Sequence, residues 1–300
     1  MTYLGSMSTN NITPAQGRLG VLLPGMGAVA STFIAGVMAA RRGIHPPIGS
    51  VTQMANIRLG SREEDRNPLI RDFVSLASLD DLVFGGWDPI SPNAMEAAKT
   101  AGVLQGGDLE EVAKELEGVV AMEAVFDEKW VSRLSGVRVK AIPNKWDQAL
   151  ALIDDINRFR EENECDRLVM VWCGSTEAYQ EPSAVHASVA AFEQGLKDND
   201  ANIAPSQIYA YAALQCDVPF ANGAPNLTTD LDCIVELSKQ RNVPIAGKDF
   251  KTGQTLMKTI LAPGLKSRML GLRGWYSTNI LGNRDGEVLD APENFKTKEM

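Results

Sequence analysis

Residues 18–43 read RLGVLLPGMGAVASTFIAGVMAARRG, and this stretch decides the fold. Its first part, residues 19–23, is a short apolar run, and a glycine-rich break follows it. Apolar residues then recur at helical spacing until the stretch ends on Arg41, Arg42 and Gly43. This order predicts a strand, a tight turn and a helix.

The glycine-rich break, Gly25-Met26-Gly27-Ala28-Val29-Ala30, fits the dinucleotide-binding pattern G-x-G-x-x-A in its strand-to-helix context. Gly25 permits the tight turn, Gly27 lets the backbone approach a pyrophosphate, and the helix amides from Ala28 onward face the anion. A plain turn is the alternative, since residues 48–54, where an acid for the ribose is usual, contain none.

Asp88 is the better candidate for the ribose. It follows the apolar run 82–84 and two glycines, at the carboxyl end of a predicted strand, where an open sheet collects ligands. The alternative is that Asp88 caps the helix that follows. Ser175 and Thr176 occupy the equivalent place after the predicted strand 168–172, and by themselves they fit helix caps as well as ligands.

Apolar runs and helical periodicity alternate along most of the chain. We expect further strands at 82–84, 119–125, 168–172, 208–214, 243–246 and 275–281, and helices at 93–101 and 146–163. Strands that alternate with helices indicate an α/β fold with a mostly parallel sheet. The polar residues 1–16 are typical of a flexible tail, and lysines and glycines multiply after residue 245, which indicates a second element.

The composition is that of a globular protein without general affinity for polyanions. Of the 300 residues, 44% are hydrophobic, and 38 acidic against 29 basic side chains give a net charge of −9. Nucleic acid and anionic membrane surfaces are therefore not expected as partners. The four cysteines lack CxxC spacing and the two histidines are far apart, which argues against disulfides, a metal site and a His-based triad. No apolar stretch suits a secretory signal or a membrane span, which predicts a cytoplasmic location.

The segment GKDFKTGQT, residues 247–255, directly follows a predicted strand. Lysines beside small hydroxyl and amide side chains suit a phosphate, and Asp249 can hold a lysine or accept hydrogen bonds from sugar hydroxyls. A solvated charged turn is the alternative. Two related clusters follow, NRDG at 283–286 and KTKE at 296–299, and with no histidine nearby the acid and base work would fall to lysine.

Taken together, GxGxxA, PIGSVTQMANIRLG, DLVFGGWDPISPNA, VWCGSTE, IAGKDFKTGQT and LGNRDG followed by FKTKE resemble the myo-inositol-1-phosphate synthase family. The resemblance runs from about residue 19 to the last residue. It implies conversion of glucose 6-phosphate to an inositol monophosphate with tightly held NAD, through oxidation at C5, enolisation, intramolecular aldol closure and reduction. It also implies a homotetramer, a Rossmann-like doubly wound sheet in residues 17–245, and the start of an α+β catalytic and tetramerisation domain in residues 246–300.

The resemblance also assigns roles position by position. The residues implied to bind NAD are Gly25, Gly27, Ala28, Val29, Asp88, Cys173, Gly174, Ser175, Thr176, Asp249, Asn283 and Asp285. The implied catalytic residues are Lys298, Asp249, Asp285 and Lys251, and the implied substrate-binding residues are Thr252, Gly253, Gln254 and Lys298. The sequence departs from the family where Lys248, Thr252 and Arg284 replace its more usual Asp, Ser and Asn.

The family continues beyond the position of Met300 and supplies further active-site lysines there. We therefore expect the 300-residue chain alone to lack synthase activity and to expose the apolar edge at 275–281. The alternatives are a noncatalytic NAD-binding remnant and an NAD-dependent sugar-phosphate dehydrogenase, which would release NADH.

Overall fold

The computed structural model describes residues 15–250, 253–276 and 284–300, and a parallel sheet is its centre. Within these residues five strands lie in the order β2-β1-β3-β4-β5, and every pairing is parallel. The strands are β1 (Arg18–Pro24), β2 (Leu82–Trp87), β3 (Cys165–Trp172), β4 (Phe220–Asn222) and β5 (Ile245–Ala246). The chain leaves β1 for β2 on one side and then returns to β3 on the other, so the strand order reverses at β1. The predicted doubly wound α/β fold is confirmed.

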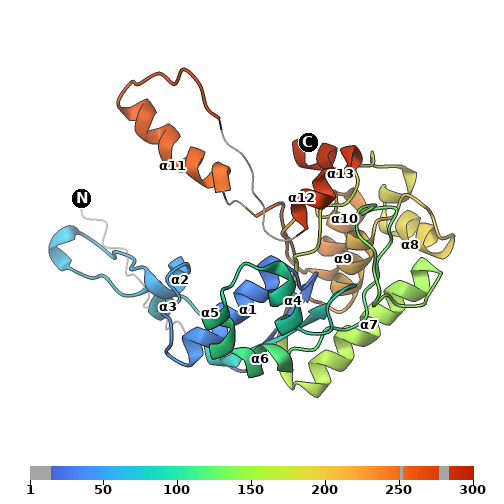
Figure 1. Ribbon diagram of the computed structural model, residues 1–300, viewed down its shortest axis with the longest axis horizontal. Coiled ribbons are helices and arrows are strands. Elements are labelled where there is room, and N and C mark those ends of the chain that lie inside the picture. The colour runs from blue at the N-terminus through green and yellow to red at the C-terminus, as the bar shows by residue number, and fades with distance from the viewer. Residues whose placement is uncertain (1–14, 251–252, 277–283) are drawn as a thin grey trace, which may run out of the picture.

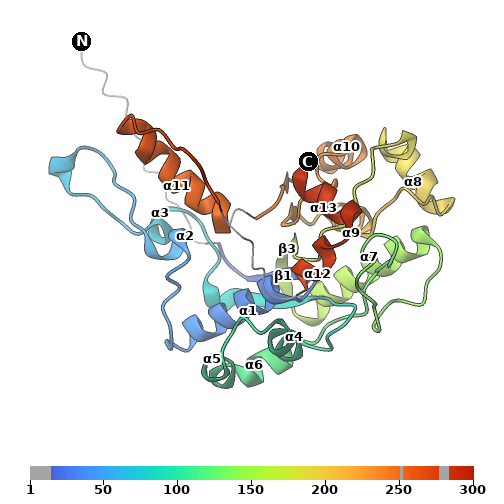
Figure 2. The ribbon, with the colours of Figure 1, turned by 45° about the horizontal axis from the view of Figure 1, so that its top comes forward.

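Helices cover both faces of this sheet (Figure 2). Successive β1 side chains point to opposite faces, so Leu22 packs into one core while Val21 and Leu23 pack into the other. The core around Val21 includes α1 (Ala28–Arg41), α4 (Ala94–Ala101), α5 (Gly106–Glu111) and α6 (Ala113–Gly118). The core around Leu22 includes α7 (Lys145–Glu162), α8 (Val189–Lys197), α9 (Pro205–Gln215) and α10 (Asp232–Arg241).

Two predicted strands are wrong. Residues 208–214 lie in α9, which is buried on all sides and therefore lacks the one-sided apolar pattern that identifies a surface helix. The strand that actually joins the sheet there is β4, whose three residues are too few to show alternation. Residues 119–125 pair only through isolated bridges such as Trp87 to Met122, because this segment runs along the outside of β2.

The helix α11 (Gly253–Ser267) stands away from the sheet as an arm (Figure 1). Leu256, Met257 and Ile260 on this arm are about half exposed. Trp275 and Tyr276, which follow it, are not in a strand, and the rest of the strand predicted at 275–281 lies outside the described residues.

After residue 284 the chain returns to the body through α12 (Asp285–Leu289) and α13 (Pro292–Glu299), which lie beside α9 and α10 (Figures 1 and 2). Short helical turns complete the description: α2 (Val51–Met54), α3 (Ile70–Phe73), η1 (Arg62–Glu64), η2 (Leu79–Asp81) and η3 (Ala184–His186). Among the residues described, no helix has the length and apolar character needed to cross a membrane. Most of the tail predicted at 1–16 lies outside the described residues.

Candidate functional site

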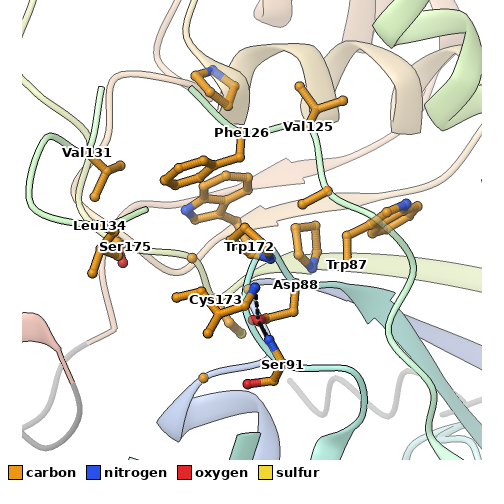
Figure 3. Close-up of a pocket in the computed structure, with 18 of the residues that line it drawn as sticks. Trp87, Asp88, Ser91, Val125, Phe126, Val131, Leu134, Trp172, Cys173 and Ser175 are labelled. Carbon is orange, nitrogen blue, oxygen red and sulfur yellow. Dashed lines mark hydrogen bonds between the residues drawn. The ribbon is translucent and has the colours of Figure 1, made fainter. Parts of the chain in front are cut away.

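A cavity of about 110 Å³ opens at the carboxyl ends of β1, β2 and β3. Figure 3 shows its apolar wall, formed by Val125, Phe126, Val131 and Leu134, with Trp172 in the middle. The polar side is supplied by the turns that leave the three strands. The cavity thus occupies the position where the strand order reverses, which is where open α/β sheets bind their ligands.

The glycine turn forms one edge of this cavity. Gly25 has φ +83° and its N–H donates to the carbonyl of Trp87 at 2.8 Å. Gly27 begins α1 and provides no side-chain cap, so backbone N–H groups of the first helical turn remain available to an anion. Ala28 is half-buried, while Val29 is 51% exposed beside them. The turn predicted from the sequence is confirmed.

Asp88 lies at the end of β2 and is only 6% exposed. Its Oδ1 accepts the N–H groups of Ile90 at 2.9 Å and Ser91 at 2.6 Å (Figure 3). Burial raises the pKa of this carboxyl, while the amides of Ser91, Ile90 and Met26 act in the opposite direction. The cap of the following helix is Asn93, whose side chain accepts the N–H of Glu96, so the alternative of Asp88 as an N-cap is wrong.

The turn after β3 forms the opposite edge. Cys173, Gly174 and Ser175 line the cavity, and the N–H of Cys173 donates to the carbonyl of Pro24 at 2.9 Å. Burial raises the pKa of the Cys173 thiol to about 12, so this cysteine is a neutral lining group rather than a nucleophile. Thr176 is buried, and its carbonyl accepts a hydrogen bond from Asn294 in α13.

A second polar cluster brings together three residues that are far apart in the sequence. The Nζ of Lys298 lies 3.0 Å from Oδ1 and 2.9 Å from Oδ2 of Asp249. Asp249 is fixed at the end of β4, because its N–H lies 3.2 Å from the carbonyl of Asn222 and 3.1 Å from that of Ala224. Burial raises the pKa of Asp285, the Lys298 ammonium lowers it, and the charge of Asp249 raises it. Two acids and the lysine therefore share one electrostatic environment.

The remaining sequence-predicted residues lie at the start of the α11 arm or outside the description. Gly253 and Gln254 begin α11, and Lys251, Thr252 and Asn283 lie outside the described residues. Arg284, next to Asp285, lines the cavity and so links it to the second cluster.

The family model described as myo-inositol-1-phosphate synthase, an NAD-binding model, matches residues 19–292. The chain belongs to the myo-inositol-1-phosphate synthase family.

Relatives and solved structures agree with this family. Inositol-3-phosphate synthase 1 of Bacteroides thetaiotaomicron is 54% identical over 96% of this chain and 67% of its own length. Inositol-3-phosphate synthase of Citrus paradisi is 34% identical over 94% of this chain and 59% of its own length. A crystal structure of inositol-3-phosphate synthase from Caenorhabditis elegans matches with a TM-score of 0.83 and 25% identity, over 96% of this chain and 59% of that one. The chain thus spans between 59% and 67% of the length of these relatives.

The cofactor of this myo-inositol-1-phosphate synthase family domain is NAD, and the residues at the cavity fit it. Gly25 and Gly27 leave the backbone open to a pyrophosphate, and α1 begins there without a side-chain cap. Asp88 places a carboxyl at the neighbouring strand end, where it can accept hydrogen bonds from ribose hydroxyls. Residues 82–98 contain no arginine that would receive a 2′-phosphate.

One residue of this site was missed from the sequence. Glu177 lines the cavity and is buried, and its carboxylate accepts the N–H of Ser206 at 2.8 Å and the hydroxyl of Ser206 at 2.6 Å. Burial raises the pKa of Glu177 to about 7. The sequence signal that could have identified Glu177 is its place directly after the polar turn that follows the predicted strand 168–172, at the carboxyl end of that strand.

Proposed function

We propose that this chain carries the NAD site and part of the catalytic centre of an inositol-3-phosphate synthase, which converts D-glucose 6-phosphate to 1D-myo-inositol 3-phosphate. The observation that carries the proposal is the contact of Lys298 with Asp249, beside Asp285 and Arg284, at the same sheet edge as the glycine turn. A simple nucleotide-binding module has no need for a lysine that is paired with one acid and interacts with the charge of a second beside its cofactor cavity.

The substrate and product of this reaction are isomers, so the two electrons removed at C5 must be returned before release. NAD, when bound, supplies the acceptor and later the donor of that hydride. The chain's own residues supply positioning and proton transfer. We assign Asp88 to the adenosine ribose, and Gly25, Gly27, Ala28 and Val29 to the pyrophosphate. We also assign Cys173, Gly174, Ser175 and Thr176 to the dinucleotide, together with Asp249, Asn283 and Asp285.

Among the residues that the structure describes, Lys298 is the one proposed as the general acid or base. Enolisation removes a proton from a carbon beside a carbonyl and places negative charge on oxygen, and an ammonium group can stabilise that oxygen or give it a proton. Asp249 holds the ammonium in a fixed position, and Asp285, with its raised pKa, is suited to accept a proton. Lys251 is a further proposed catalytic residue, and Thr252, Gly253 and Gln254, with Lys298, are the proposed contacts to the sugar phosphate.

The test uses a chimera in which residues 1–300 are continued by the part of the Bacteroides thetaiotaomicron relative that follows the matched segment. Incubated with glucose 6-phosphate and NAD, the chimera should accumulate inositol monophosphate with no net absorbance from NADH. Net NADH would favour a sugar-phosphate dehydrogenase. NAD binding without any turnover, while the Bacteroides thetaiotaomicron protein is active in parallel, would favour the noncatalytic alternative.

The homotetramer, the cytoplasmic location and the division at residues 245 and 246 belong to the same proposal. The mass of the chimera measured by light scattering after size exclusion tests the assembly.

A further inference from the structure

The contact of Lys298 with Asp249 joins two segments that are 49 residues apart in the sequence. Lys298 is near the end of α13, so its position depends on how that helix is held. Asp249 is held separately by main-chain hydrogen bonds at the end of β4. The geometry of the pair is therefore set by whatever docks α13 on the body of the protein.

Two buried polar side chains dock this helix. Asn294 is 0% exposed, and its Nδ2 donates to the carbonyls of Trp130 at 2.9 Å and Thr176 at 2.7 Å. Thr297 is 4% exposed, and its hydroxyl donates to the carbonyl of Glu177 at 2.7 Å. A fourth bond, from the main-chain N–H of Tyr179 to the carbonyl of Glu293, also holds the helix, at 2.8 Å. Asn294 and Thr297 are three residues apart and so lie on one face of the helix.

Two of the acceptors, the carbonyls of Thr176 and Glu177, belong to the turn after β3 that lines the cofactor cavity. Thr176 and Glu177 directly follow Cys173, Gly174 and Ser175. At its other end this turn is tied to the glycine turn, because the N–H of Cys173 donates to the carbonyl of Pro24. One continuous set of hydrogen bonds therefore runs from the glycine turn through the β3 turn to α13.

We propose that Asn294 and Thr297 are positioning residues that fix Lys298 relative to the cofactor turn. The catalytic meaning of this inference rests on the proposed function, whereas the placement of Lys298 does not. Neither side chain contacts the reacting groups in this arrangement, and both act through the backbone of α13. Without the Thr297 bond, the helix loses the anchor nearest to Lys298, and the fraction of molecules in which the ammonium separates from Asp249 rises.

The placement is tested on the 300-residue chain by limited acetylation of lysines, quantified by mass spectrometry. Thr297→Val keeps the shape of the side chain and removes the donor. Losing one hydrogen bond of this kind shifts the equilibrium between docked and released α13 about fivefold toward the released form. Because the released lysine reacts, Lys298 should be acetylated up to about fivefold faster. Thr297→Ser restores the donor and should return the rate to within about twofold of the parent. Lys239 in α10 is the internal reference, and Ser238→Ala, which removes a hydroxyl bond to the carbonyl of Val243, is the matched control variant.

An unchanged Lys298 rate in Thr297→Val would overturn the proposal, and so would a failure of Thr297→Ser to restore it, since shape rather than the donor would then matter. If Thr297→Val does not fold, Thr297→Ala is compared with Thr297→Ser in the same way. In the chimera, Thr297→Val should lower kcat by up to about fivefold with the KM for NAD unchanged. A chimera that makes no inositol phosphate would count against the proposed function and leave the acetylation result to decide the placement of Lys298.

Discussion

Gly25 and Gly174 lie against each other at the ends of β1 and β3, so closely that a Cβ on Gly25 would come within 2.4 Å of the Cα of Gly174. The two turns that border the cofactor cavity therefore pack backbone on backbone. Gly25 also has φ +83°, a conformation that residues with a side chain rarely adopt. A Cβ atom at position 25 would therefore strain the backbone and also push the two turns apart.

Gly25→Ala should therefore weaken NAD binding by about tenfold or more, since left-handed strain alone costs about 1–2 kcal/mol. Isothermal titration with NAD measures the loss. Gly36→Ala is the matched control, because it lies within α1 and a Cβ there meets no atom within 4 Å. That control should bind NAD normally and gain about 0.5–1 kcal/mol of stability. Equal NAD affinity in both variants would contradict the close-packing argument.

Asp88→Asn should weaken NAD binding by about tenfold, because hydrogen bonds to a charged acceptor contribute roughly 1.5–3 kcal/mol. The Oδ1 of Asp88 is already used by the amides of Ile90 and Ser91, so the variant keeps the turn and loses only the charge. The parent chain should prefer NAD over NADP, since a 2′-phosphate would meet a carboxylate. Paired titrations with the two nucleotides measure this preference, and tighter binding of NADP would remove Asp88 from the ribose.

Asp155 holds Trp87, one of the residues that line the cavity. It is buried, accepts the indole N–H of Trp87 at 2.8 Å, and pairs with Lys140 at 2.8 Å and with Arg158. Asp155→Asn would leave the ammonium of Lys140 without its charge partner, which costs about 3 kcal/mol for a buried pair. Urea unfolding should show this loss of stability. Asp154→Asn, on the exposed face of α7, the helix that also carries Asp155, should change the free energy of unfolding by less than about 0.5 kcal/mol. Similar losses in both variants would show that the buried pair is not the cause.

Glu177 should make the protein less stable as the pH rises. Burial raises its pKa from 4.5 to about 7, so between these values the native state holds a proton that the unfolded chain has released. Stability contributed by the protonated form is therefore lost across that window and stays lost above pH 7. Glu177→Gln should remove this dependence, and its free energy of unfolding relative to the parent should rise by about 3 kcal/mol between pH 4.5 and pH 8.

Urea unfolding at the two pH values measures the Glu177 effect. Glu181→Gln, an exposed acid four residues further on, is the control and should follow the parent at both values. Parallel curves for the parent and Glu177→Gln would mean that Glu177 is charged in the native state throughout.

The elements of this fold that sequence reasoning predicted correctly are those with local patterns. An apolar run, a glycine turn and helical spacing predict β1 and α1, and one apolar face predicts α7. The helix α9 was mistaken for a strand because burial on every side removes the contrast on which periodicity depends. Its partner β4 is three residues long and is defined by its neighbours in the sheet, which no local pattern records.

The site residues also fall into those that a local sequence pattern predicts and those whose position depends on tertiary contacts. Gly25 and Asp88 follow apolar runs directly, so their place at the sheet edge could be predicted from the chain itself. The contact of Lys298 with Asp249 depends on the docking of α13, which Asn294 and Thr297 achieve through bonds to main-chain carbonyls. Only the family resemblance, and not the spacing of residues, pointed to that pair before the structure did.

Lys298→Ala gives the sharpest separation of chemistry from cofactor binding. In the chimera it should cut turnover by about 10² or more, the scale of a lost acid or base, while the affinity for NAD stays within about twofold. Lys296→Ala is the matched control, because it removes an equal charge from the same helix at a position where the ammonium lies 4.3 Å from the centroid of the Tyr179 ring. Steady-state turnover and NAD titration are measured on both variants. If Lys298→Ala retains activity within a few fold of Lys296→Ala, the proton transfer belongs to another lysine, and the ion pair with Asp249 serves only to hold α13 in place.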